Sequence, residues 1–196
     1  MEKNIQKVLL IGSVGVDRFR IVREFCNKIN VKEILGIDFH FKKVNLNGNI
    51  ITLQLWDTVG HERLTRLTSA LYKNSDGALL VYDIDNKESF EEISQYKDRI
   101  KKESPDVKLV LVGVKFNSQT SIEQNENNSL FKNIYNFVIS YNPFSTKEQT
   151  QKTSNVSYEE GEAKAKEFGC DFFEISKFTK ENVDQAFDIL IEKLVS

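Results

Sequence analysis

The 196-residue sequence has little cysteine, with only Cys26 and Cys170. Two cysteines cannot form the disulfide framework of a small secreted domain, and their spacing matches no zinc-binding pattern. Long hydrophobic runs are also lacking, because none approaches the ~18 apolar residues of a membrane-spanning helix. The first residues do not have the pattern of a secretory signal. We therefore expect a reduced, cytoplasmic compartment.

The sequence also lacks an excess of basic residues. It has 27 Lys and Arg against 29 Asp and Glu, so its formal net charge at pH 7 is −2. Electrostatic binding to nucleic acid usually needs a basic patch, and we expect no nucleic-acid partner. The residues "IEKLVS" (191–196) contain no cysteine. We therefore expect no direct lipid anchor of the Cys-a-a-X type there.

What the sequence does contain is an alternation of strand and helix patterns. Continuous apolar runs at 8–11, 78–82 and 107–112 are typical of strands buried on both faces of a sheet. Alternating residues on both sides of Asn47-Gly48 predict an antiparallel hairpin. Within this hairpin we expect His40 to point outward.

A last strand is expected at 170–175, after a helix that opens with the capping-box pair Ser157 and Glu160. The other helical stripes cover 21–29, 90–100 and 183–194. Six strands with interleaved helices predict an α/β fold, with a mostly parallel six-stranded sheet, one antiparallel edge strand and helices on both faces. Ligands of such sheets bind beyond the carboxyl ends of the strands.

The segment 118–156 interrupts this alternation. It is rich in Asn, Gln, Ser and Thr, a composition typical of a polar insertion. Within it, "LFKNIYNFVISY" (130–141) carries an apolar stripe with helical spacing. The stripe is compatible with a helix packed on its own domain, with an arm that docks a partner, or with a plug over a neighbouring pocket.

The stretch "KVLLIGSVGVDRFR" (7–20) begins like a phosphate-binding loop, because Gly12 and Gly15 follow an apolar run. The pattern G-x-x-x-x-G-K-[ST] would then require Gly, Lys and a hydroxyl residue where Asp17, Arg18 and Phe19 stand. A glycine turn that only joins a strand to a helix would begin in the same way. The residues alone are compatible with a damaged loop, a repurposed loop or a merely similar turn.

Five segments together resemble one protein family. The stretch "LWDTVGHE" (55–62) resembles the switch II signature of the Ras-superfamily small GTPases. The stretches "LGIDFHF", "LYKNSDGALLVYDIDNKESF", "YEEGEAKAKEFGCDFFEIS" and "ENVDQAF" narrow the resemblance to the Rab branch. The likeness implies one P-loop small-GTPase domain over 1–196, with an Asn/Gln-rich insertion at about 118–156.

The resemblance also identifies the positions that would bind a guanine nucleotide. Asp17 replaces a glycine of the family and would repel a phosphate by about 4 kcal/mol at ~4 Å and an effective dielectric of ~20. Arg18 replaces the lysine of the family. It would pair with Asp17 or with Asp57, or it would reach the phosphates in a working loop. The nucleotide-binding candidates are Gly12, Gly15, Val16, Asp17, Arg18, Phe19, Asp57, Gly60, Lys115, Asn117 and Ser176.

Metal binding and catalysis are expected to be lost. Phe19 and Ile34 stand where family members carry hydroxyl ligands of Mg²⁺, and neither side chain has an oxygen. Asp57 and Gly60 are retained, but a lone carboxylate makes a poor magnesium site. His61 replaces the glutamine that orients the attacking water, so it is either a vestigial catalytic position or an exposed residue.

Guanine recognition is degraded as well. The family motif N-K-x-D becomes "VKFN", so Asn117 offers one acceptor where an aspartate accepts two N–H bonds. Val114 removes an amide, while Lys115 is kept. Ser176 is the single residue retained from the later S-A-K loop.

Phe39, Trp56 and Tyr72 match the aromatic triad with which Rab proteins bind partners, although they could also be ordinary packing residues of the hairpin and switches. The sequence therefore predicts a Rab-like pseudo-GTPase: a protein-interaction module of vesicle and membrane trafficking, recruited to endomembranes through its protein partners. We expect no metal and no cofactor beyond weak, Mg²⁺-independent GDP or GTP binding. The alternative is an atypical Rab GTPase that binds GTP and GDP and hydrolyses GTP slowly.

Overall fold

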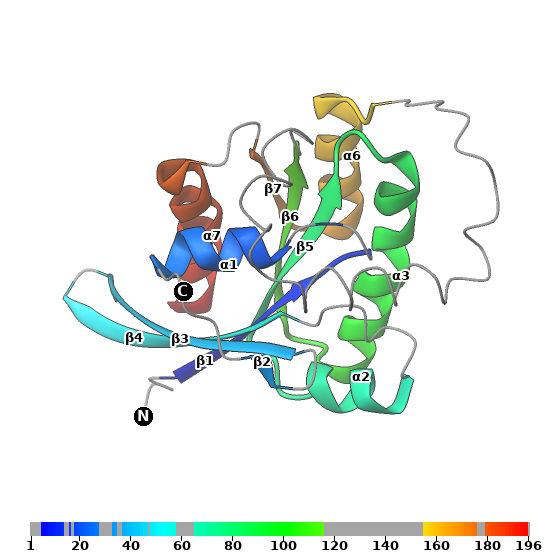
Figure 1. Cartoon of the computed structure of the whole chain (residues 1–196). Helices are drawn as coiled ribbons and strands as arrows, with labels where there is room; N and C mark the ends of the chain where they lie inside the picture. The colour runs from blue at the N-terminus through cyan, green and yellow to red at the C-terminus, as the bar shows by residue number, and fades with distance from the viewer. Residues whose placement is uncertain are drawn as a thin grey trace.

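The computed structural model describes residues 5–13, 16, 18–27, 33–34, 37–46, 48–57, 65–115, 155–175 and 179–195 (Figure 1). Nearly all of the expected insertion at 118–156 lies outside these residues. The helices and strands are β1 (Ile5–Ile11), α1 (Arg18–Cys26), β2 (Glu33–Ile34), β3 (Ile37–Leu46), β4 (Asn49–Asp57), α2 (Thr65–Tyr72), β5 (Gly77–Asp83), α3 (Lys87–Glu103), β6 (Lys108–Val114), α6 (Tyr158–Phe168), β7 (Asp171–Ile175) and α7 (Lys180–Val195).

The described strands form one mixed sheet in the order β2-β3-β4-β1-β5-β6-β7. β3 and β4 pair antiparallel as a hairpin, whereas β4, β1, β5, β6 and β7 run parallel to one another. The six predicted strands are all present, and the predicted α/β fold is confirmed. The two-residue strand β2 adds a short antiparallel pairing with β3 at the edge of the sheet.

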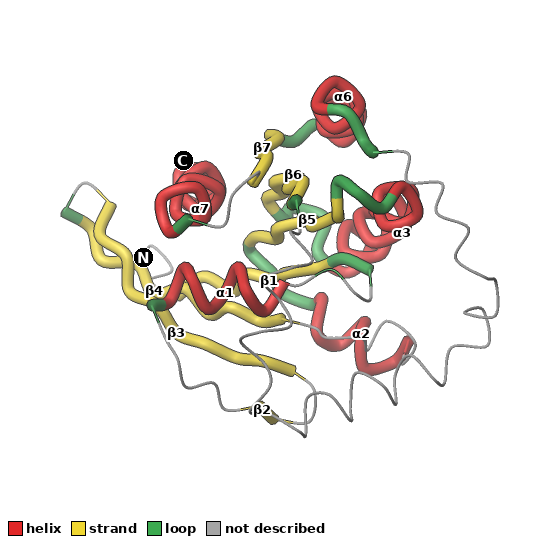
Figure 2. The backbone as a smooth tube through the Cα atoms, turned by 45° about the horizontal axis from the view of Figure 1, so that its top comes forward, coloured by secondary structure: helices red, strands yellow, loops and turns green. Residues whose placement is uncertain are grey.

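Helices cover both faces of this sheet, as predicted (Figure 2). On one face, Phe25 of α1 stacks on Phe187 of α7 with ring centroids 3.6 Å apart. α2, α3 and α6 pack on the other face. Each face has its own apolar cluster, because β1, β5 and β6 carry apolar side chains on both of their sides.

His40 is the one hairpin residue whose direction was predicted wrongly. It is only 7% exposed, because its register partner is Leu55, which is fully buried on the face covered by α1 and α7. The neighbouring position in the strand therefore takes the outer face, and Phe41 is 52% exposed. Alternation along the hairpin follows from the sequence, but which set of residues points inward depends on where the helices pack.

Tyr82 of β5 is fully buried, and two glycines leave room for its side chain. A Cβ atom at Gly113 of β6 would lie 2.7 Å from Tyr82 Oη. A Cβ atom at Gly161 of α6 would lie 2.6 Å from the same oxygen and 2.5 Å from Phe172 Cζ. A Cβ atom at this position would force the Tyr82 and Phe172 rings to shift within a close-packed interior.

Replacing Gly161 by alanine is expected to lower the free energy of unfolding by about 1–3 kcal/mol, because the added methyl group overpacks this contact. The helix propensity of alanine acts in the opposite direction, by about 1 kcal/mol. Urea unfolding followed by circular dichroism measures the change. Ala163→Gly, at an exposed position of α6, calibrates the propensity term. A Gly161→Ala protein that is more stable than the wild type would contradict the packing argument.

Candidate functional site

The candidate site lies where β1 and β4 end side by side. The two strands are parallel, and their register places Asp57 beside Leu10, two residues before Gly12. The chain then crosses from Gly12 through the buried Val16 to Arg18, which begins α1. This is the location that an open α/β sheet offers to a ligand, at the carboxyl ends of its strands.

An ion pair occupies the centre of this site. Arg18 Nε donates to Asp57 Oδ1 over 3.0 Å, and the two side chains are only 3% and 1% exposed. Arg18 Nη1 also donates to the carbonyl oxygens of Gly12 and Ser13, at 2.8 Å in the case of Ser13. Of the two partners predicted for Arg18, Asp57 is thereby confirmed, whereas Asp17 lies outside the described residues.

The guanidinium of Arg18 thus ties the start of α1 to the end of β4 and to the loop between β1 and α1. A buried charge is tolerated only when it is paired and hydrogen-bonded, and here one carboxylate and two carbonyl groups meet that need. The planar fork of arginine suits several simultaneous acceptors. Arg18 therefore binds its own chain at the position where the family's lysine would face a phosphate.

A second carboxylate reaches the same loop from α3. Ser13 Oγ donates to Glu92 Oε2 over 2.5 Å. Sequence reasoning missed Glu92, because it is separated from Ser13 by 79 positions and lies in a helix of ordinary charged composition. The contact binds α3 to the loop and places a further negative charge beside it.

Gly12 is required by close packing. A Cβ atom at this position would lie 2.1 Å from the carbonyl oxygen of Val81 in β5. Only glycine allows the loop to leave β1 so close to the neighbouring strand. Close packing therefore explains why this position is glycine, independently of any bound phosphate.

The described residues do not fit a magnesium ion. Asp57 is engaged by Arg18, and Phe19 and Ile34 have no side-chain oxygen. Among the described residues, no group of three or more His, Cys, Asp or Glu side chains is arranged to hold a metal. Mg²⁺ requires a nearly octahedral set of oxygen ligands, which these described residues do not supply.

The base-recognition end of the site is only partly described. Val114 is fully buried at the end of β6, and its carbonyl oxygen accepts from Ile84 N over 2.9 Å. The exposed Lys115 follows it, and its backbone N–H donates to the carbonyl oxygen of Ile175 over 3.1 Å. Both residues lie at the carboxyl edge of the sheet, as the resemblance implied. The predicted site residues outside the described part are Gly15, Asp17, Gly60, His61, Asn117 and Ser176.

Two members of the predicted aromatic triad form a surface pair. Phe39 and Trp56 are cross-strand partners in the hairpin, with ring centroids 4.5 Å apart and ring planes at 59°. Both are partly exposed, whereas Tyr72 is 1% exposed within the apolar cluster under α2 and α3. Phe39 and Trp56 are therefore partly accessible to solvent, whereas Tyr72 is buried in the cluster against which Trp56 packs.

Comparison with known proteins defines the class. The sequence model described as the Ras family matches residues 7–196. The Ras-related protein SEC4 of Saccharomyces cerevisiae is 32% identical, over 94% of this chain and 72% of its own length. The GTP-binding protein ypt2 of Schizosaccharomyces pombe is 31% identical, over 96% of this chain and 80% of its own. The mouse Ras-related protein Rab-12 is 40% identical, over 60% of this chain and half of its own length.

The chain therefore belongs to the Ras family of small GTPases, in its Rab branch. Its fold and the position of its phosphate loop agree with that membership. Within the described residues, no helix is both long and apolar enough to span a bilayer.

Replacing Arg18 by alanine is expected to lower the free energy of unfolding by about 3–5 kcal/mol, because Asp57 would remain buried without its partner charge. Urea unfolding of the full chain measures the loss. The matched control is Arg23→Ala in the same helix, whose side chain is 30% exposed and whose loss should cost less than about 1 kcal/mol.

The double variant Arg18→Met with Asp57→Leu is expected to regain most of that stability, since no buried charge is then left unpaired. If Arg18→Ala costs no more than Arg23→Ala, the ion pair does not hold the site together.

Proposed function

We propose that this chain is a Rab-type pseudo-GTPase, a protein-interaction module of vesicle and membrane trafficking that binds guanine nucleotide weakly, without Mg²⁺, or not at all. The observation that carries this proposal is the ion pair of Arg18 with Asp57. In a relative with bound nucleotide, the residues at these two positions would have to contact the phosphates and the metal region. In this chain, Arg18 and Asp57 neutralise each other instead.

The electrostatics of the loop support weak phosphate binding. A triphosphate would have to draw Arg18 away from Asp57 and leave that carboxylate buried without its partner, which costs several kcal/mol. Glu92 places a negative charge beside Ser13, and Asp17, which belongs to the same loop in the sequence, adds a second negative charge. An anion arriving there would meet carboxylates and an arginine whose Nε and Nη1 donors are already engaged.

The remaining nucleotide-binding positions support the same conclusion. Phe19 and Ile34 supply no metal ligand, and Asn117 cannot accept both N–H bonds of guanine. With neither a metal nor a clamped γ-phosphate, His61 has no bound phosphate to which it could direct a water molecule. We therefore propose that the chain works without GTP hydrolysis, in the cytoplasm, and reaches endomembranes through protein partners that contact the surface around Phe39 and Trp56.

Nucleotide extraction tests the proposal. The full chain, purified natively in the presence of Mg²⁺, is denatured, and the released nucleotides are separated by chromatography. We expect substoichiometric GDP and GTP, because the loop does not hold them through purification. The ypt2 protein of Schizosaccharomyces pombe, whose name describes it as GTP-binding, serves as the positive control. Stoichiometric GDP or GTP in the natively purified chain would overturn the proposal.

The second candidate function is an atypical, slow Rab GTPase. It is favoured by the retained positive charge of Arg18 at the first residue of α1, since a helix N-terminus together with a cation can bind an anion. This candidate predicts that GDP or GTP raises the melting temperature of the wild type and that Arg18→Ala abolishes the rise. Thermal unfolding with and without nucleotide measures both effects. No rise for the wild type would exclude this candidate.

A further inference from the structure

An amine and a thiol lie close together where α1 ends against the hairpin and α7. The amine is that of Lys42 in β3, and the thiol is that of Cys26, the last residue of α1. Both side chains are partly exposed, so a small molecule in solution can reach them. A neutral lysine amine and a cysteine thiolate are both nucleophiles toward acyl groups. The proposed function uses neither of them.

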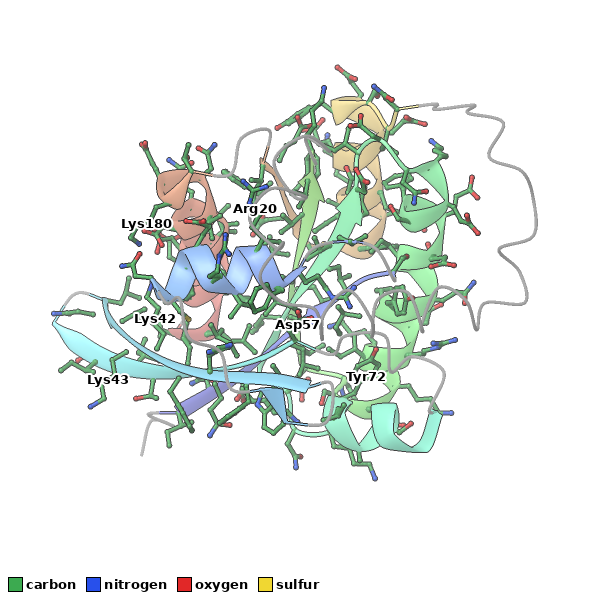
Figure 3. All side chains as sticks on the ribbon, viewed as in Figure 1. Arg20, Lys42, Lys43, Asp57, Tyr72 and Lys180 are labelled. Atoms are coloured by element: carbon green, nitrogen blue, oxygen red, sulfur yellow. The ribbon has the colours of Figure 1, made fainter. Side chains whose placement is uncertain are left out.

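Three contacts fix the amine of Lys42. Its Nζ atom donates to the carbonyl oxygen of Phe25, lies 3.4 Å from the centroid of the Phe25 ring and pairs with Asp184 Oδ1 over 3.8 Å. Figure 3 shows Lys42 on the side of α1 and the neighbouring Lys43 on the opposite side of the hairpin. The amine of Lys42 is therefore held at one place, whereas that of an exposed lysine samples many rotamers.

This place is beside Cys26, because the carbonyl group that binds Lys42 belongs to the residue before it, Phe25. By standard peptide dimensions, the hydrogen bond places Lys42 Nζ within about 6 Å of the Cα atom of Cys26. The Cys26 thiol also acts electrostatically on the amine, which requires that the two groups lie near each other. An acyl group carried by the sulfur of Cys26 would therefore be within reach of Lys42.

The surroundings of Lys42 increase the fraction of its amine that is neutral. Burial is the main cause of its lowered pKa, and Asp184 acts in the opposite direction. The positive charge of Lys180 lowers this pKa further, whereas Cys26 and Asp188 raise it. Lys180 Nζ also binds the second oxygen of Asp184, over 2.5 Å, so that two amines share this carboxylate. Partial burial of a lysine is a usual way to make its amine nucleophilic at neutral pH.

The chain carries a comparison residue for each member of the pair. Lys43 follows Lys42 in the sequence but is solvent-exposed on the other side of the hairpin. Cys170 is partly exposed, like Cys26, and lies between α6 and β7. Burial raises the pKa of the Cys170 thiol to about 11, so that little thiolate forms there at neutral pH.

We propose that Cys26 and Lys42 form a self-acylation site for an acyl thioester, in which Cys26 accepts the acyl group and passes it to Lys42. Holding the donor and the acceptor on one rigid surface makes the second step intramolecular, which greatly raises its rate. This inference goes beyond the proposed function and does not depend on whether the chain binds a nucleotide.

The reaction has two steps. In the first, the thiolate of Cys26 attacks the carbonyl carbon of the thioester. A bond from that carbon to Cys26 Sγ forms, the bond to the carrier sulfur breaks, and the carrier leaves as a thiol with the proton of Cys26. In the second, the neutral amine of Lys42 attacks the same carbon. The new C–N bond replaces the bond to Sγ, and a proton moves from nitrogen to sulfur.

The products are an amide on Lys42, a restored thiol on Cys26 and a free carrier thiol. The one proton released overall is the proton that the Lys42 ammonium loses to water before it reacts, and nothing is oxidised or reduced. The amide carries no charge, so the ion pair with Asp184 is lost. We therefore expect acylation to loosen the attachment of the hairpin to α7.

The experiment exposes the full chain to acetyl-coenzyme A near neutral pH. Mass spectrometry of a chymotryptic digest measures acetylation with time, and fragment spectra distinguish Lys42 from Lys43. We expect Lys42 to react at least about tenfold faster than Lys43, because only Lys42 has a thiol beside it. Cys26→Ala should reduce the rate at Lys42 to about that at Lys43, and the matched control Cys170→Ala should leave it unchanged.

A second variant, Lys42→Arg, traps the intermediate while it keeps the positive charge beside Asp184. Arginine stays protonated and does not accept the acyl group. We expect acetyl groups to accumulate on Cys26 of this variant, to be released by neutral hydroxylamine, and to be absent from Cys170. Reversible blocking of the thiols of the unsubstituted chain as methyl disulfides gives an independent test that needs no substitution. The fast acetylation of Lys42 should disappear on blocking and return on reduction.

Three results would overturn this proposal. They are equal rates at Lys42 and Lys43 in the unsubstituted chain, an unchanged rate at Lys42 after blocking or in Cys26→Ala, and no hydroxylamine-sensitive acetyl group on Cys26 in Lys42→Arg. The second result would mean that the thioester acylates Lys42 directly, without the thiol. Nucleotide extraction is a separate readout, so a chain that retains GDP yet acetylates Lys42 through Cys26 would refute only the proposed loss of nucleotide binding.

Discussion

The buried ion pair between Arg18 and Asp57 is the constraint on which the functional end of this molecule depends. It joins the first residue of α1 to the last residue of β4, and the same guanidinium donates to two carbonyl groups of the loop between β1 and α1. The chain supplies both charges itself, and the low exposure of the two side chains makes separating them costly.

Membership in the Ras family and a buried Arg18–Asp57 ion pair are compatible, because fold and chemistry are determined by different residues. The sheet, its two apolar clusters and the close approach at Gly12 depend on packing, and they tolerate the loss of a ligand. Metal and base recognition depend on a few polar groups at the strand ends. The apolar side chains of Phe19 and Val114 stand at two such positions, and the architecture accommodates both.

The hairpin shows how one packing arrangement produces two different surfaces. Its inner side is fastened by Lys42 and by apolar side chains against α1 and α7, so the alternating residues between them must face water. Those residues include exposed isoleucine and phenylalanine side chains next to lysines, and no acid. A surface on β-strands is presented continuously, whereas a surface made by nucleotide-ordered segments depends on the ligand.

The sequence by itself determined six of the strands, four of the helices, the hairpin, and the chemical unsuitability of Phe19 and Ile34 as metal ligands, because periodicity and the absence of an oxygen are local properties. Helix α2 and the two-residue strand β2 were seen only in the structure. It narrowed the partner of Arg18 to two acids, but only the tertiary structure selected Asp57, since parallel pairing of β1 and β4 brings that residue alongside. The contact of Glu92 with Ser13 and the inward direction of His40 were likewise decided by packing. No local sequence pattern predicts which distant helix will lie against a loop, or which side of a strand the helices will cover.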